Sequence, residues 1–170
     1  EKVVTIFDLI NEKFNKTFYK EKKNSHKKEI LNFADKIICI SNNTKKDLLN
    51  YYDIDEKKIS VIYLGYPDKK KNLQKIFDFP YILYVGTRWK YKNFENLLKA
   101  ISFSNYLKKS FKLIAFGGGK FNRYEEDLIK KYDLKNVLQI EGDETKLHSC
   151  YKHASLFVYP TKYEGFGLPI

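Results

Sequence analysis

Short apolar runs of five or six residues, separated by longer polar stretches, recur along this 170-residue chain. The runs are rich in β-branched and aromatic residues, which is typical of strands. They are continuous rather than alternating, as in strands whose sheet is covered on both faces. The runs lie at 3–7, 36–40, 59–64, 81–85, 111–116, 137–141 and 155–159. They predict seven strands.

Helical spacing fills most of the intervals between these runs. Residues 44–52 and 93–107 are the clearest cases, and the second places four apolar side chains on one face, namely Phe94, Leu97, Leu98 and Ile101. Residues 15–28 are polar and predict a loop or the mobile beginning of a helix. Strands that alternate with helices predict βαβ units, and hence an α/β fold with parallel sheets.

Residues 66–80 interrupt this alternation with two prolines, a charge run and no periodicity. We therefore predict a linker at 68–80 between two parallel-sheet units, at 1–67 and 81–170. The first has three predicted strands, which is half of a Rossmann unit. The second stops after a glycine-rich turn that should begin another helix. We expect both units to be incomplete in this chain.

The net charge of +11 is the strongest signal in the composition. It would suit a polyanionic partner, and a basic nucleic-acid-binding module is one alternative. However, residues 1–75 carry 17 basic and 11 acidic side chains, and the remaining residues carry 15 and 10. Because the charge is spread evenly and Arg88 and Arg123 are the only arginines, we expect no nucleic-acid partner.

Other classes of protein fit the sequence poorly. No apolar run approaches the roughly 18 residues of a membrane span, and the first residues do not resemble a signal peptide, so we expect a cytoplasmic protein. Cys39 and Cys150 have no nearby cysteine partner and are predicted to be buried, inert thiols. His148 and His153 lack ligand spacing, so we predict no metal site.

A first candidate site follows the strand at 81–85. Gly86 and Thr87 form a turn there, and Arg88 and Lys92 precede a predicted helix. Ligands of open α/β sheets bind at the carboxyl ends of strands, and helix N-terminal amides favour phosphate. A solvated basic turn is the alternative.

Two further turns follow later strands. Gly117, Gly118 and Gly119 permit close approach of a ligand to the backbone, although a simple turn explains them equally well. The loop at 159–169 sets Glu164 beside Gly165 and Gly167, where a carboxylate could accept hydrogen bonds from sugar hydroxyls. A loop that merely turns is the alternative here.

Taken in order, the three turns resemble glycosyltransferase family 4, whose retaining enzymes have two facing Rossmann-like domains, the GT-B fold. The run EGFGLP resembles the front half of the E-x7-E motif of that family, and YVGTRWKYKNF resembles its donor-phosphate turn. Residues 34–67 resemble the end of the acceptor domain and the hinge. In two places the chain departs from the family: Phe7 stands where many relatives carry histidine, and the second glutamate would fall beyond Ile170.

The resemblance implies specific roles for residues. Arg88, Lys92 and Glu164 would be catalytic, the two cations stabilising the leaving diphosphate and the carboxylate holding the sugar. The implied donor-binding residues are Gly86, Thr87, Gly117, Gly118, Gly119, Ile140, Glu141, Gly165, Phe166, Gly167 and Leu168. Asp8 is the remaining polar group at the end of the first strand and a candidate acceptor-domain residue.

The implied reaction is the transfer of a hexose, with mannose from GDP-mannose preferred, to a saccharide in surface polysaccharide or lipopolysaccharide synthesis. GDP- or UDP-sugars and a saccharide or lipid-linked acceptor would be the partners, and no cofactor is implied. A lysine cluster at 20–28 suggests contact with the inner face of a membrane, although a solvated loop explains it too. We expect the isolated chain to be inactive, and an inactive relative that keeps only the fold is the alternative.

Overall fold

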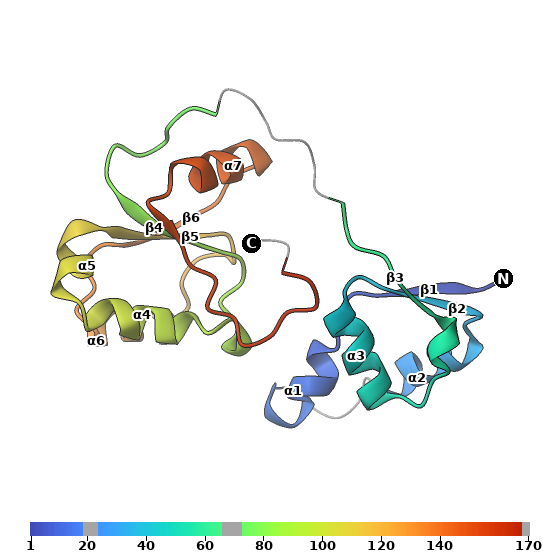
Figure 1. Cartoon of the computed structure of the whole chain (residues 1–170). Helices are drawn as coiled ribbons and strands as arrows, with labels where there is room; N and C mark the ends of the chain where they lie inside the picture. The colour runs from blue at the N-terminus through green and yellow to red at the C-terminus, as the bar shows by residue number, and fades with distance from the viewer. Residues whose placement is uncertain (19–23, 66–72, 168–170) are drawn as a thin grey trace. The chain divides into compact units, whose positions relative to one another are not determined.

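The computed structural model describes residues 1–18, 24–65 and 73–167 (Figure 1). Contacts divide them into two compact units: the first contains residues 1–65 and 163–167, and the second contains residues 73–162. Each unit is an α/β fold built on one parallel sheet. The predicted fold class of two parallel-sheet units is therefore confirmed.

The first unit has a three-stranded sheet in the order β1-β2-β3. Its strands are β1 (Val3–Ile6), β2 (Lys36–Cys39) and β3 (Ile59–Val61). Its helices are α1 (Ile10–Phe18), α2 (Asn24–Phe33), α3 (Asn42–Tyr51) and the 3-10 turn η1 (Glu56–Lys58). The apolar core between sheet and helices is formed around Leu9, Leu31, Ile37 and Leu48, all almost fully buried.

The second unit has a four-stranded parallel sheet in the order β6-β5-β4-β7. The strands are β4 (Tyr81–Val85), β5 (Lys112–Phe116), β6 (Val137–Ile140) and β7 (Leu156–Phe157). The helices are η2 (Lys90–Lys92), α4 (Phe94–Ser102), α5 (Asn105–Ser110), α6 (Arg123–Lys131) and α7 (Glu144–His153). The strand order reverses beside β4, so a topological switch point lies between β4 and β7.

Side chains of β4 and β5 enter two separate cores, one on each face of this sheet. On one face Ile82 and Tyr84 pack with the apolar side of α4 and with Leu128 of α6. On the other, Leu83 and Ile114 pack with Cys150 of α7. All five residues of β4 are buried. The continuous apolar pattern of the strand runs is thus explained by helices on both faces.

One prediction about the helices was wrong, and another was right in part. The single helix expected at 93–107 is two helices, because the Ser104 side chain accepts a hydrogen bond from the Leu107 amide and begins α5 there. Residues 15–28, for which we expected a loop or the beginning of a helix, contain the end of α1 and the beginning of α2, while residues 19–23 lie outside the described part. Polar composition alone did not reveal these helices, since surface helices also carry many polar residues.

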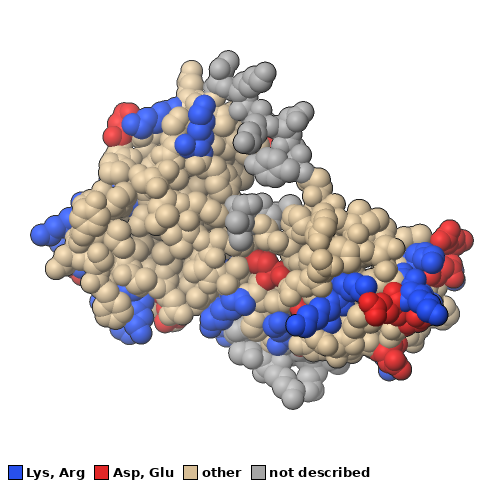
Figure 2. Space-filling view, in the orientation of Figure 1, with Lys and Arg blue, Asp and Glu red and all other residues tan. Residues whose placement is uncertain are grey.

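Charged side chains are dispersed over the surface. Figure 2 shows lysines and arginines at several separate places on one face, many of them beside acidic side chains. Lys27 pairs with Glu12 and Lys45 with Glu56, each with a nitrogen to oxygen distance of 2.7 Å. No helix among the described residues is long and apolar enough to cross a membrane.

The two cysteines are free and buried, as predicted. Each lies in the core of a different unit. Burial raises the pKa of Cys39 to about 11, although Lys45 opposes the shift, and burial also raises the pKa of Cys150. Both thiols are therefore held in the protonated, unreactive form at neutral pH.

We expect both thiols to resist Ellman's reagent at pH 8 in the folded protein and to react rapidly in guanidinium. A rise of the pKa from 9.0 to about 11 lowers the thiolate fraction of Cys39 about 100-fold at that pH. Because the unfolded thiol ionises first, this group's contribution to stability is present below pH 9 and is lost as pH rises toward 11. Fast labelling of folded protein would contradict this account.

Candidate active site

The carboxyl ends of β4, β5 and β6 bring together the first two candidate turns. Beyond the strands, the Gly86 amide donates to the Phe116 carbonyl and the Gly117 amide to the Ile140 carbonyl, both at 2.9 Å. Gly86 has a φ of 113°, and Gly117, Gly118 and Gly119 have φ values of 78°, 74° and 74°. Glycine tolerates these left-handed conformations, which explains why four glycines occur at this edge.

Arg88 donates hydrogen bonds to several backbone carbonyls at this edge of the sheet. Its Nη1 donates to the Gly117 carbonyl at 2.8 Å, and its Nη2 donates to the carbonyls of Gly119 and Lys120 at 2.8 and 3.1 Å. A weaker bond of 3.3 Å reaches the Gly118 carbonyl. The guanidinium therefore holds the glycine turn closed through its backbone carbonyls.

A buried carboxylate completes the environment of Arg88. The Nε atom donates to Oε1 of Glu125 at 2.9 Å, and the side chains are 2% and 9% exposed. The ring of Phe121 lies 4.9 Å from the guanidinium carbon and that of Phe94 lies 5.8 Å from it. Such contacts between a cation and aromatic faces add to the ion pair. The Arg88 side chain is thus partnered inside the second unit.

Lys92 joins the turns on either side of the switch point. Its Nζ donates to the Tyr159 hydroxyl at 3.0 Å and lies 5.3 Å from the centre of that ring. Asn93 donates to the Pro160 carbonyl at 3.0 Å, and the Lys162 amide donates to the Tyr91 carbonyl at 2.9 Å. The segments after β4 and β7 are therefore connected by several polar contacts at the place where such sheets bind ligands.

The Glu164 segment packs on the first unit, although the sequence assigned it to 81–170. The Asn43 side chain donates to the Glu164 carbonyl at 2.9 Å, and Ser41 and Thr44 donate to the Gly165 carbonyl. These three side chains lie at the beginning of α3, where Ser41 is the N-cap. Gly165 is needed there, because a Cβ atom would lie 2.1 Å from the Phe7 carbonyl oxygen.

Tyr163 anchors the same segment. Its ring makes an edge contact with Phe14 and lies 4.3 Å below the Lys13 ammonium. Burial, followed by hydrogen bonding to Asp47, raises the pKa of its hydroxyl far above the ordinary value. This hydroxyl remains protonated over the working range of pH. Phe166 lies against Tyr63, with the ring centroids 6.1 Å apart.

The remaining predicted residues have simpler surroundings. Oδ1 of Asp8 accepts a hydrogen bond from the Ile10 amide at 3.0 Å, so this carboxylate supports the beginning of α1. Glu141 accepts a bond from Lys146 through its backbone carbonyl at 2.7 Å. Leu168 and the lysines at positions 20, 22 and 23 lie outside the described residues. The described residues contain no cluster of metal-ligating side chains.

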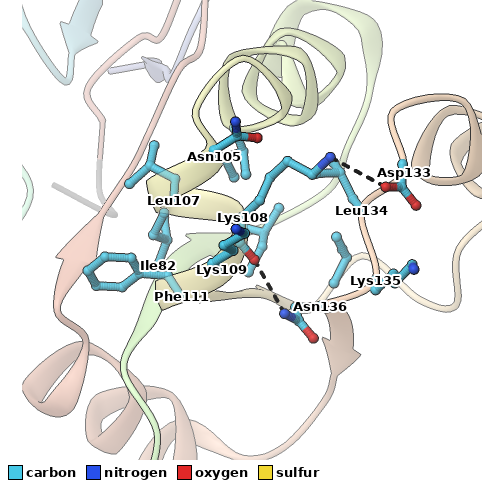
Figure 3. Close-up of a pocket in the computed structure, with 13 residues that line it drawn as sticks. Ile82, Asn105, Leu107, Lys108, Lys109, Phe111, Asp133, Leu134, Lys135 and Asn136 are labelled. Atoms are coloured by element: carbon cyan, nitrogen blue, oxygen red, sulfur yellow. Dashed lines mark hydrogen bonds and ion pairs between the residues drawn. The ribbon is translucent and has the colours of Figure 1, made fainter.

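A separate hollow of about 440 Å³ lies at the opposite edge of the second sheet (Figure 3). It is lined by Ile82, Leu113 and Val137, near the amino ends of their strands. Lys108 on its wall pairs with Asp133 at 3.6 Å, and Asn136 donates to the Lys108 carbonyl at 3.4 Å. This hollow lies away from the candidate active site.

Sequence reasoning missed two residues of the site, Glu125 and Tyr159. A signal for Glu125 was present, because Asn122 and Glu125 have the N-x-x-E spacing of a capping box, which the structure contains. Nothing in the sequence connected this glutamate to Arg88, 37 residues away. Tyr159 was within a predicted strand, so its hydroxyl was not considered as a partner of Lys92.

Two family models match the chain. "Glycosyl transferases group 1" matches residues 66–170, and "Glycosyltransferase Family 4" matches residues 3–70. The first covers more than half of the chain and includes the glycine turns, Arg88 and Lys92. The second covers the first sheet and its helices.

Two similar proteins are named as glycosyltransferases of O-antigen and amylovoran synthesis. The chain is 29% identical to the O-antigen chain mannosyltransferase RfbU of Salmonella typhimurium over 136 residues, 78% of this chain and 37% of RfbU. It is 25% identical to the amylovoran biosynthesis glycosyltransferase AmsD of Erwinia amylovora over 141 residues, 79% of this chain and 39% of AmsD. The chain thus spans less than two-fifths of the length of these relatives.

Solved structures share the fold. S. aureus TarM, in a complex with fondaparinux, α-GlcNAc-glycerol and UDP, matches with a TM-score of 0.74 and 20% identity over 99% of this chain and 34% of TarM. WaaG, a glycosyltransferase involved in lipopolysaccharide biosynthesis, matches with a TM-score of 0.74 and 18% identity, covering 99% of this chain and 52% of WaaG. Both likenesses support the fold class of two parallel-sheet units, as in GT-B glycosyltransferases.

Two alanine substitutions distinguish the strain of the glycine turn from its packing against Arg88. Gly118 and Gly119 have the same φ of 74°, so each Ala variant should lose about 1 kcal/mol through backbone strain. At Gly118 the new Cβ would also lie 2.7 Å from Nη1 of Arg88 and 2.8 Å from the Gly86 carbonyl, whereas at Gly119 it meets nothing within 4 Å.

We therefore expect Gly118→Ala to destabilise the second unit by about 1–3 kcal/mol more than Gly119→Ala. Hydrogen exchange at the β4 and β5 amides measures the difference. Equal destabilisation in the two variants would show that the turn does not pack on Arg88.

Proposed function

The chain belongs to the group 1 glycosyltransferases, and on this basis we propose that the whole protein transfers a hexose from a nucleotide sugar to a saccharide acceptor with retention of anomeric configuration. We propose mannose as the sugar and GDP-mannose as the donor, which the similarity to the mannosyltransferase RfbU supports. The proposed acceptor is a saccharide or lipid-linked saccharide of a surface polysaccharide. The reaction would then take place in the cytoplasm, at the inner face of the membrane.

The observation that supports donor binding best is the position of two turns, those after β4 and β7, at the switch point. The turn after β4 carries Gly86, Thr87 and Arg88, and it is connected through Lys92 and Asn93 to the segment after β7. Open α/β sheets bind nucleotides in the crevice at this position. Asn93 begins α4 without a side-chain cap, so the first amides of this helix favour an anion.

Arg88 and Lys92 are the proposed phosphate ligands. A leaving nucleoside diphosphate gains negative charge as the glycosidic bond breaks, and fixed cations stabilise that charge more in the transition state than in the ground state. The guanidinium is fixed by Glu125 and two aromatic rings before any donor binds. Little reorganisation of the cation is then needed during the reaction.

The neighbouring backbone would accommodate the rest of the donor. Gly117 to Gly119 lack side chains that could obstruct the phosphates, and Gly117 and Gly119 have open space where a Cβ would stand. Ile140 and Glu141, at the carboxyl end of β6, would lie along the nucleobase. These residues follow adjacent strands of one sheet, so they share the same edge.

The Glu164 segment would hold the transferred sugar. We propose that the carboxylate of Glu164 accepts hydrogen bonds from sugar hydroxyls and that the amides of Phe166, Gly167 and Leu168 meet hydroxyls or the diphosphate. Anchoring of Tyr163 and Gly165 on the first unit supports this, because it fixes the backbone on both sides of Glu164. Asp8 is the proposed group on the acceptor side.

Replacing both phosphate ligands tests the proposal. In the whole protein, Arg88→Ala with Lys92→Ala should lower the rate of sugar transfer at least about 100-fold, because the charge on the leaving group is no longer balanced. Lys90→Ala is the control for the loss of Lys92, since Lys90 lies in the same 3-10 turn and its replacement also removes one positive charge. We expect the control to retain transfer.

Sugar transfer is measured by the release of GDP or UDP from a panel of nucleotide sugars. Nucleotide binding is measured by calorimetry with GDP and UDP. A folded double variant with unchanged turnover would refute the assignment of the two cations. Absence of binding of every nucleotide and nucleotide sugar by the wild-type protein would refute the proposed function itself.

A further inference from the structure

We propose that Glu125 is a positioning residue that holds Arg88 ready for the donor diphosphate, and that the carbonyls of the glycine turn are the partners that Arg88 exchanges when the donor binds. The inference rests on the proposed function, because it assumes a diphosphate at this edge. Glu125 itself would touch neither donor nor acceptor.

The two oxygens of Glu125 perform two tasks. Oε1 accepts from Nε of Arg88 at 2.9 Å, and Oε2 accepts from the Asn122 amide at 2.8 Å. The Asn122 side chain in turn accepts from the Glu125 amide at 3.0 Å, which completes the capping box of α6. The carboxylate is therefore attached to the first turn of a helix and cannot follow Arg88 if the arginine moves.

Arg88 has two kinds of partner, and they differ in strength. The bond to Glu125 joins opposite charges in a buried place, whereas the bonds to Gly117, Gly119 and Lys120 end on neutral carbonyls. All of these bonds have a charged donor, but only the one to Glu125 joins two opposite charges, and separating a buried ion pair is strongly unfavourable. A phosphate oxygen would thus replace a carbonyl far more readily than it would replace Glu125.

The chemistry of the turn allows such an exchange. Glycine has access to both signs of φ, so peptide groups between Gly117 and Gly119 can rotate with a small change in conformational energy. Rotation would turn a carbonyl away from Arg88 and an amide toward the same space. The turn would then change from an acceptor for Arg88 into a donor for phosphate, while Glu125 and the two rings keep the guanidinium in place.

The most informative substitution for testing this proposal is Glu125→Gln in the whole protein. Glutamine at this helix position preserves a capping box, so α6 keeps its first turn, but the ion pair with Arg88 is lost. Glu126→Gln is the matched control, because Glu126 is exposed, adjacent and in the same helical turn. Asn122→Ala is a second control, which weakens the helix cap and leaves the Glu125 carboxylate in place.

The readouts are the dissociation constants of GDP, UDP and nucleotide sugars, the KM and kcat for the donor, and the melting temperature. We expect Glu125→Gln to weaken donor binding and lower kcat/KM about 10-fold or more, since a small displacement of a charged group affects catalysis strongly. Glu126→Gln should bind as the wild type does. Asn122→Ala should lower the melting temperature without a comparable loss of binding.

A double-mutant cycle separates positioning from general stability. In an Arg88→Ala background, Glu125→Gln should cause no further loss of donor binding, because there is no longer a guanidinium to position. The inference is overturned by wild-type affinity in Glu125→Gln, or by an equal loss in both backgrounds. If the wild-type protein itself binds no nucleotide, the proposed function fails first, and that result is distinguishable from the other two.

Discussion

The pairing of β4 with β5 on one side and β7 on the other is the constraint on which the second unit depends. β4 pairs with β5 over five residues and with β7 over two, and every one of its residues is buried. Since its side chains enter different cores on the two faces, a shift of register by one residue would send each of them into the wrong core. The reversal of strand order beside β4 then places the turn at Gly86 to Arg88 at the switch point.

Arg88 connects the segments that this strand order brings together. A buried cation must be paired and hydrogen-bonded, and this one takes Glu125 from α6 and carbonyls from the turn after β5. The same contacts explain why Gly118 is restricted by its neighbours while Gly119 has open space. The edge of the sheet is therefore held by one side chain that connects β4, β5 and α6, and the proposed phosphate site is part of that arrangement.

Much of the fold was predictable from the sequence. The run at 81–85 identified β4 with both of its ends, and the run at 111–116 identified β5 to within one residue, because buried parallel strands are apolar throughout. The run at 59–64 predicted too long a strand, since β3 ends at Val61. Helix boundaries were harder, because the break at Ser104 depends on a cap that competes with an otherwise favourable apolar pattern.

The sequence by itself determined which residue types follow each strand: glycines, Arg88 and Lys92 after β4, and glycines after β5. It also determined the similarity to the group 1 glycosyltransferases. Only the tertiary structure decided the partners of these residues, including Glu125 for Arg88, Tyr159 for Lys92 and the beginning of α3 for the Gly165 carbonyl. The reason is physical: composition and periodicity report local conformation and burial, whereas pairing between residues 37 to 121 positions apart follows from strand order and helix packing.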